Sequence, residues 1–140
     1  MEYSIINVYM PNNYNEKNEC WQSLLDLAKE NPPQNLIIAG DFNTTRSSKE
    51  KRGGSMVRDQ FWERLEDLIL NLDLFDVPSN KGMYTWNNGR VGPGHIATRL
   101  DRFLINNSLL SLPAKLCSMN LPWAGSDHLP IRLAFEAQNK

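Results

Sequence analysis

"LIIAGDFNTT" (36–45) joins a short apolar run to a polar end, and this stretch decides the fold. Its first four residues, 36–39, show no alternation of polar and apolar side chains, which predicts a strand covered on both faces of its sheet. Gly40 then leads into an acid and an amide two positions apart, Asp41 and Asn43. Polar groups that follow a covered strand are typical of α/β proteins, whose functional sites form at strand ends.

The segments around this strand predict an α/β layered domain that spans residues 1–140. "YSIINVYMP" (3–11) predicts a strand, because it is rich in β-branched residues and stops at a proline. Segment 44–55 has no apolar residue and predicts a loop. Apolar residues at helical spacing predict two helices, at 16–30 and 57–72. Further strands are expected at 83–86, 98–106 and 126–136.

Bulk composition excludes some classes of protein. With 140 residues, 41% hydrophobic and 22% charged, the chain is an ordinary globular domain. No apolar run approaches the roughly 18 residues of a membrane span, so no membrane partner is expected. A net charge of −1 gives no global argument for nucleic acid, so that argument must be local. Basic residues of two polar loops are candidate phosphate contacts: Arg46, Lys51, Arg52 and Arg90.

Reactive side chains occur at four places on or beside the predicted strands. Each of them also has a structural interpretation when taken singly. Asp41 could be a turn residue, and Asp101 could form an ion pair with a neighbouring arginine (99 or 102). His128 could be a packing histidine, and Tyr9 could be a core residue. Taken together, they are the groups that a metal-assisted phosphodiester hydrolase needs. Carboxylates suit Mg²⁺ or Mn²⁺, histidine suits a general base, and a second carboxylate can fix the histidine's tautomer.

Five motifs in order identify a family resemblance: "NVYMP" (7–11), "GDFN" (40–43), "YTW" (84–86), "RLDRFLI" (99–105) and "SDH" (126–128). They resemble the endonuclease/exonuclease/phosphatase superfamily, whose DNase I-like fold is a four-layer α/β sandwich. "GDFNTTRSSKEKRGGS" and "YTWNNGRVGPGHIATRLDRFLIN" are similar to endonuclease domains of plant LINE-type (non-LTR) retrotransposons. This implies a nuclear or cytoplasmic hydrolase that cuts DNA with Mg²⁺, in an element that also encodes a reverse transcriptase.

The resemblance also implies a role for each matching residue. Asp41 corresponds to the catalytic aspartate that handles the proton of the attacking water or the leaving oxygen. Asn43 and Tyr9 correspond to residues that contact the scissile phosphate. His128 corresponds to the histidine at the reacting phosphate, a general base or a transition-state stabiliser. Asp101 corresponds to the aspartate that orients this histidine.

One part of the family pattern has no counterpart in these 140 residues. Family members carry a metal-binding glutamate on a strand that precedes the "NVYMP" motif, which here starts at Asn7. The resemblance therefore implies that the chain forms the C-terminal portion of the fold, with one sheet face uncovered. Asp127 and Asp41 would then be the only acidic metal ligands. Weak Mg²⁺ or Mn²⁺ binding and low or absent activity are expected. The alternatives are a non-catalytic remnant or binding fragment, and a phosphatase of the same superfamily, which "TRLDRFLI" (98–105) disfavours.

Overall fold

The structure is a computed structural model that describes residues 2–30, 33–55 and 57–137. Its centre is a four-stranded sheet in the order β1-β2-β7-β4. The strands are β1 (Ser4–Tyr9), β2 (Leu36–Asp41), β7 (Asp101–Asn106) and β4 (Leu74–Asp76). β1 pairs with β2 in parallel, and the other two pairs are antiparallel. The register sets Asp41 opposite Tyr9 on one side and opposite Asp101 on the other.

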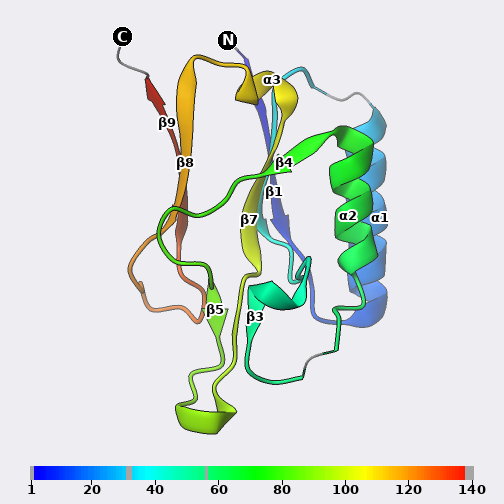
Figure 1. Ribbon diagram of the computed structural model, residues 1–140. Coiled ribbons are helices and arrows are strands. Elements are labelled where there is room, and N and C mark those ends of the chain that lie inside the picture. The colour runs from blue at the N-terminus through cyan, green and yellow to red at the C-terminus, as the bar shows by residue number, and fades with distance from the viewer. Residues whose placement is uncertain (1, 31–32, 56, 138–140) are drawn as a thin grey trace.

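Two helices, α1 (Tyr14–Glu30) and α2 (Trp62–Leu72), cover one face of this sheet (Figure 1). Their apolar stripes pack against the strands and exclude water, which is the main favourable term in forming this layer. No helix within the described ranges is long and apolar enough to cross a membrane. The main core includes the buried side chains Trp21, Leu24, Ile38, Leu65, Leu68 and Leu104.

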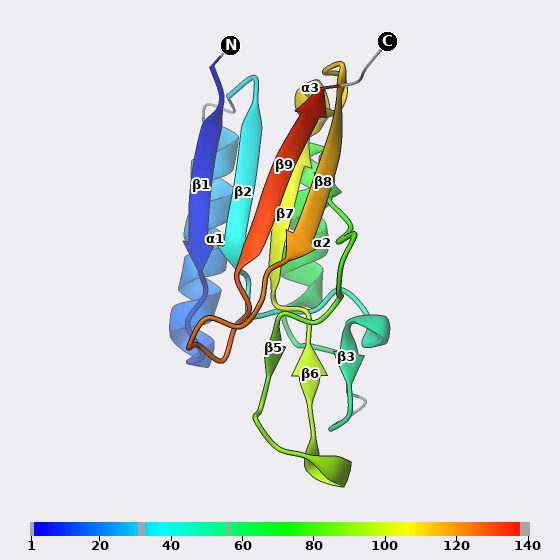
Figure 2. The same ribbon diagram turned by 90° about the vertical axis from the view of Figure 1, so that its left-hand side faces the viewer.

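A second layer covers part of the opposite face. Strands β8 (Ala114–Asn120) and β9 (Ile131–Ala137) pair antiparallel and lie over β2 and β7 (Figure 2). A smaller core forms there around Ile37, Ile105 and Leu109, the last on the short helix α3 (Asn107–Leu110). The expectation of an uncovered face is therefore wrong for β2 and β7. It holds for β1, whose Ile5 is 61% exposed.

A small antiparallel sheet extends the molecule beyond the end of β2 (Figure 2). Its order is β3-β6-β5, with β3 (Lys51–Arg52), β6 (Ala97–Thr98) and β5 (Trp86–Asn87). Short 3₁₀ turns, η1 (Ser48–Glu50) and η2 (Gly92–Gly94), precede β3 and β6. A bridge between Trp86 and His128 ties this sheet to the segment before β9.

Several elements differ from those that the sequence predicts. The helix expected from residue 57 begins at Trp62, because the Asp59 carboxylate accepts the Phe61 N–H at 2.8 Å and holds a turn there. The strand expected over 98–106 is split between β6 and β7, because Leu100 and Asp101 give their N–H groups to the Thr85 hydroxyl.

Strand boundaries also differ elsewhere along the chain. The segment 83–86 contributes only its last residue to β5, and "SDH" precedes β9 instead of starting it. β4 and β8 are not predicted, and the 44–55 loop contains η1 and β3. These changes leave the predicted α/β class intact and move the "SDH" motif into a loop at the end of the sheet.

Candidate active site

The turn after β2 brings Asp41 and Asn43 to one edge of the sheet. Gly40 has a φ of +130°, and a Cβ there would lie 2.2 Å from the Val8 carbonyl oxygen, so only glycine permits this approach of β1 and β2. Asp41 Oδ1 accepts the Asn43 N–H at 2.8 Å. Asn43 itself has a left-handed φ of 46°, which asparagine tolerates better than most residues. Its side-chain amide donates to Asn12 Oδ1 at 2.6 Å, so the group is already oriented.

His128 lies between two carboxylates at this edge. Its Nδ1 is 2.7 Å from Asp101 Oδ2, and its Nε2 is 3.6 Å from Asp41 Oδ2. A carboxylate only accepts hydrogen bonds, so Nδ1 carries the proton and the neutral ring presents Nε2 as its acceptor. Asp101 is held in place from behind, because its own N–H and that of Leu100 donate to the Thr85 hydroxyl.

Charges around the site shift two pKa values upward. Burial lowers the pKa of His128, but the hydrogen bond and charge of Asp101, together with the charges of Asp41 and Asp127, outweigh it and the net shift is upward. Burial and the neighbouring Asp101 charge raise the pKa of Asp41, against the Asn43 N–H and the charges of His128 and Lys17. A positive charge that enters this site is therefore stabilised by carboxylates on two strands.

Asp127 sits on the loop that carries His128. It is exposed, and its Oδ2 accepts the indole N–H of Trp86 at 3.1 Å. The N–H of Leu129 donates to the Thr85 carbonyl oxygen at 2.7 Å, so the loop is fastened to β5 on both sides of the histidine. Trp86 is half-buried and lines the site.

A cavity of about 740 Å³ opens over these groups. The predicted site residues that line it are Tyr9, Asp41, Asn43, Lys51, Asp127 and His128. Tyr9 is 78% exposed, so it is not the core residue that one reading of the sequence suggested. Arg52 and Arg90 instead line a separate hollow of about 650 Å³ with His95.

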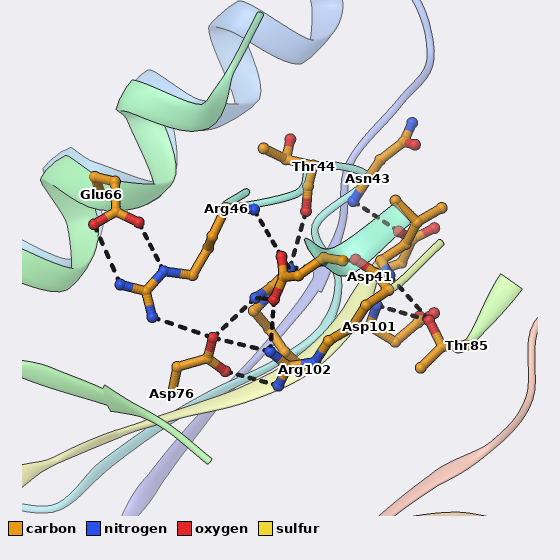
Figure 3. Close-up of polar contacts among 12 residues, drawn as sticks. Asp41, Asn43, Thr44, Arg46, Glu66, Asp76, Thr85, Asp101 and Arg102 are labelled. Atoms are coloured by element: carbon orange, nitrogen blue, oxygen red, sulfur yellow. Dashed lines mark hydrogen bonds and ion pairs between the residues drawn. The ribbon is translucent and has the colours of Figure 1, made fainter. Parts of the chain in front are cut away.

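Arg46 points away from the cavity into an ion-pair network. Its guanidinium donates to both Glu66 oxygens, at 2.7 and 3.2 Å, and lies 3.4 Å from Asp76 Oδ2 (Figure 3). The hydrogen bonds to Glu66 are the main cause of its raised pKa. Three of the five donors of this side chain are thus used inside the protein, and the expected phosphate contact has few left to offer.

Arg102 and Arg99 complete the network beneath Asp101. The fully buried Arg102 guanidinium donates to Glu50 and Asp76 at 2.8–3.0 Å, and to the Thr44 carbonyl oxygen at 3.2 Å (Figure 3). Arg99 donates to the same two acids. An ion pair of Asp101 with either arginine is therefore wrong, because these acids take both arginines and leave Asp101 to His128.

Lys17 is a site residue that sequence reasoning missed. It is only 7% exposed, and its ammonium donates to the main-chain oxygen of Asn43. The signal was present in the sequence, since Lys17 continues the stripe of Trp21, Leu24 and Ala28 at helical spacing. A charged residue in an apolar stripe indicates a buried partner.

The donors at this edge fit a divalent cation. Asp41, Asp101 and His128 offer ligand atoms that all lie within 4.8 Å of one another. The Asp101 carboxylate accepts the hydrogen bond of His128. No described side chain donates a hydrogen bond to Asp41 Oδ2 within 3.5 Å. Carboxylate oxygens are the ligands that Mg²⁺ and Mn²⁺ prefer, and a cation would relieve the repulsion between the two aspartates.

Comparison with known proteins gives one family and a set of similar folds. A family model described as endonuclease-reverse transcriptase matches residues 3–132. A search of curated proteins finds no match. The catalytic domain of Xenopus laevis APE2 aligns with a TM-score of 0.69 and 22% identity, over 99% of this chain and 52% of that one.

A second solved structure is the endonuclease domain of TRAS1, a telomere-specific non-LTR retrotransposon. It aligns with a TM-score of 0.62 and 21% identity, over 98% of this chain and 56% of that one. The chain thus spans about half the length of both structures. Both likenesses confirm the DNase I-like α/β fold that the motifs predict.

Proposed function

Because the chain belongs to the endonuclease-reverse transcriptase family, we propose that its cavity hydrolyses phosphodiester bonds of DNA with a divalent metal ion, as an endonuclease of the retroelement type. The observation that carries this proposal is the arrangement of His128, with Nδ1 on Asp101 and Nε2 facing Asp41. This arrangement lies at a cavity that also presents amide and ammonium groups. DNA is the substrate class, and a reverse transcriptase domain of the parent element is the proposed partner.

His128 acts as the general base in this proposal. The bond from Nδ1 to Asp101 fixes the tautomer, so Nε2 takes a proton from the attacking water. Asp101 then stabilises the imidazolium that forms, and Asp41 lies 3.6 Å from the protonated nitrogen. The raised pKa of His128 suits this role, because it makes the ring a stronger base.

Phosphate binding falls to groups around the cavity rim. The Asn43 amide, held by Asn12, and the exposed Tyr9 hydroxyl are proposed to donate to the scissile phosphate. Lys51 lines the same cavity and adds positive charge. Arg52 is proposed to hold a neighbouring backbone phosphate together with Arg90, with which it shares the second hollow.

Asp41 and Asp127 are the proposed ligands of Mg²⁺ or Mn²⁺, which would neutralise charge on the phosphate oxygens. Both line the cavity, but no glutamate among the described residues does. Two carboxylates bind Mg²⁺ weakly without help from substrate phosphate. We therefore propose that these 140 residues, assayed alone, nick DNA only slowly.

A plasmid-nicking assay tests the proposal. Supercoiled DNA is incubated with the purified chain in Mg²⁺, in Mn²⁺ or in chelator, beside His128→Ala and Asp41→Asn. Asp26→Asn is the matched control, because Asp26 is an exposed acid of α1 whose side chain, among the described residues, hydrogen-bonds only Gln22. We expect slow, metal-dependent nicking that either site variant reduces by about 100-fold or more.

Each contrary outcome has a definite meaning. Equal nicking by all four proteins refutes the assignment of the site. If the wild type nicks DNA rapidly and His128→Ala abolishes this nicking, the assigned site is supported and the proposed slow activity is refuted. Binding of DNA without nicking at any metal concentration supports the non-catalytic binding fragment instead.

A further inference from the structure

Lys17 lies where folding alone does not favour a charge. It occupies the first turn of α1, where the helix dipole already concentrates positive charge. Its neighbours along the buried stripe are Trp21, Leu24 and Ala28, and burial lowers the pKa of its ammonium, which Asp59 and Asp41 oppose. An apolar side chain of similar length would fill this position without desolvating a charge. The lysine is therefore best explained by what its ammonium contacts.

The ammonium has one main-chain partner and one aromatic neighbour. It donates to the carbonyl oxygen of Asn43, and it lies 4.7 Å from the centre of the Phe61 ring. Lys17 does not line the cavity, so it is separated from the reacting groups by the Asn43 peptide. Its hydrogen-bonded route to the site runs through Asn43, and its charge also acts on Asp41, whose pKa it lowers.

Both main-chain polar groups of Asn43 are hydrogen-bonded. Its N–H donates to Asp41 Oδ1 at 2.8 Å, while its C=O accepts from Lys17. The next carbonyl, that of Thr44, accepts from the buried Arg102 at 3.2 Å. Two buried cations, one on α1 and one on β7, thus bind the carbonyls two and three residues after the proposed catalytic aspartate.

We propose that Lys17 is a positioning residue of the site. By binding the Asn43 carbonyl, it holds Asn43 in its left-handed conformation, and the Asn43 N–H in turn fixes Asp41 Oδ1 so that Oδ2 faces His128. The structural part of this proposal stands by itself. Its consequence for catalysis rests on the proposed function.

Three variants separate this role from simple packing. Lys17→Met keeps the length and removes the donor, Lys17→Arg keeps a donor, and Lys29→Met removes an exposed lysine from the last turn of the same helix. Hydrogen exchange of the Asn43 amide, followed by NMR, reports directly on its bond to Asp41. The amide of Ile38 in the core reports on global opening.

The proposal expects the Asn43 amide of Lys17→Met to exchange about tenfold faster or more, with Ile38 unchanged. Lys17→Arg should restore most of the protection, and Lys29→Met should match the wild type. The unfolding midpoint of Lys17→Met should stay equal or rise, because a buried charge has been removed. Unchanged exchange at Asn43 in Lys17→Met overturns the proposal, whether or not the midpoint falls.

Nicking kinetics give the catalytic readout. In Lys17→Met, kcat should fall by about tenfold or more with little change in KM, because geometry and not substrate contact is altered. Lys29→Met should retain wild-type kinetics, and a Lys17→Met enzyme with wild-type kcat refutes the catalytic consequence. If the wild type itself does not nick DNA, the proposed function fails, while exchange at Asn43 still decides the role of Lys17.

Discussion

Asp41 and Asp101 occupy directly opposite positions of the antiparallel β2–β7 pair. Like charges at opposed positions of a sheet are unfavourable, and both side chains are largely buried, at 14% and 12% exposure. His128 contacts both of them, at 3.6 Å and 2.7 Å. The register of two strands thus creates a local excess of negative charge, and a histidine from a distant loop partly neutralises it.

Asp101→Asn should lower the pKa of His128, since it removes the charge that opposes the effect of burial. NMR titration of the His128 imidazole in metal-free buffer measures this. The raised pKa of His128 also contributes stability below about pH 6.5, which is lost as pH rises through the folded value. An unchanged His128 titration would contradict the proposed contact.

Glu50→Gln should lower the free energy of unfolding by about 3 kcal/mol, because it leaves the buried Arg102 and its neighbour Arg99 with Asp76 as their one shared acid and the cluster with a net positive charge. Urea unfolding at pH 7 measures the loss. Glu66→Gln is the control, since Glu66 is 28% exposed and should cost no more than about 1 kcal/mol.

The same variant has a predictable dependence on pH. Burial raises the pKa of Glu50, but the hydrogen bonds and charge of Arg102 outweigh it and the net pKa is lowered. Its stabilisation is therefore present above about pH 4.3 and disappears as pH falls through the lower folded value. The difference between wild type and Glu50→Gln should shrink in that acidic range, and a constant difference down to low pH would argue against the ion pairs.

Thr85→Val should cost about 2 kcal/mol, although it preserves the shape of the side chain. The change leaves the N–H groups of Leu100 and Asp101 without the hydroxyl that accepts them in a buried position. Thr85→Ser retains the hydroxyl and should cost about 1 kcal/mol for the lost methyl group. If thermal or urea unfolding shows equal losses for both variants, the hydroxyl does not anchor Asp101.

Asn43→Gly and Asn43→Ala distinguish the effect of the backbone conformation of Asn43 from that of its side-chain amide. The left-handed φ of 46° should make the glycine variant the more stable by about 1 kcal/mol in urea unfolding. Both variants lose the amide held by Asn12, so both should lose nicking activity to a similar extent. Wild-type nicking by Asn43→Gly would assign the residue a conformational role only.

The elements with a local pattern are the ones that the sequence predicts. Helix α1 and strands β1, β2 and β7 follow from periodicity and β-branched content, and the structure has each of them. β4 has only three residues, and it exists because it pairs with β7, far away in the sequence. β8 lacks alternation and forms by pairing with β9. Tertiary contacts stabilise these two strands, so no local sequence pattern indicates them.

The site residues also divide into those that the sequence indicates and those that it does not. Asp41, Asp101 and His128 meet, because the end of β2, the start of the antiparallel β7 and the loop before β9 lie at one edge of the sheet. Glu50 does not stand out in the sequence, since its partner Arg102 lies 52 residues away. Lys17 interrupts the apolar stripe of α1, but the sequence does not indicate its partner Asn43, 26 residues away. Arg46 was misleading for the same reason, because its acid Glu66 is 20 residues further along the chain.

The ion-pair network has a consequence for how salt would affect DNA binding. Its three arginines, 46, 99 and 102, face three acids, 50, 66 and 76, so the cluster carries no net charge. Few cations remain near the cavity to displace the counterions that surround DNA, chiefly Lys51, Arg52, Arg58 and Arg90. Each phosphate neutralised contributes about −0.9 to the slope of log K against log salt, so that slope should be no steeper than about −4. With that slope, doubling the salt concentration would still weaken binding by about tenfold, which is less than the loss expected of a surface that contacts six to ten phosphates.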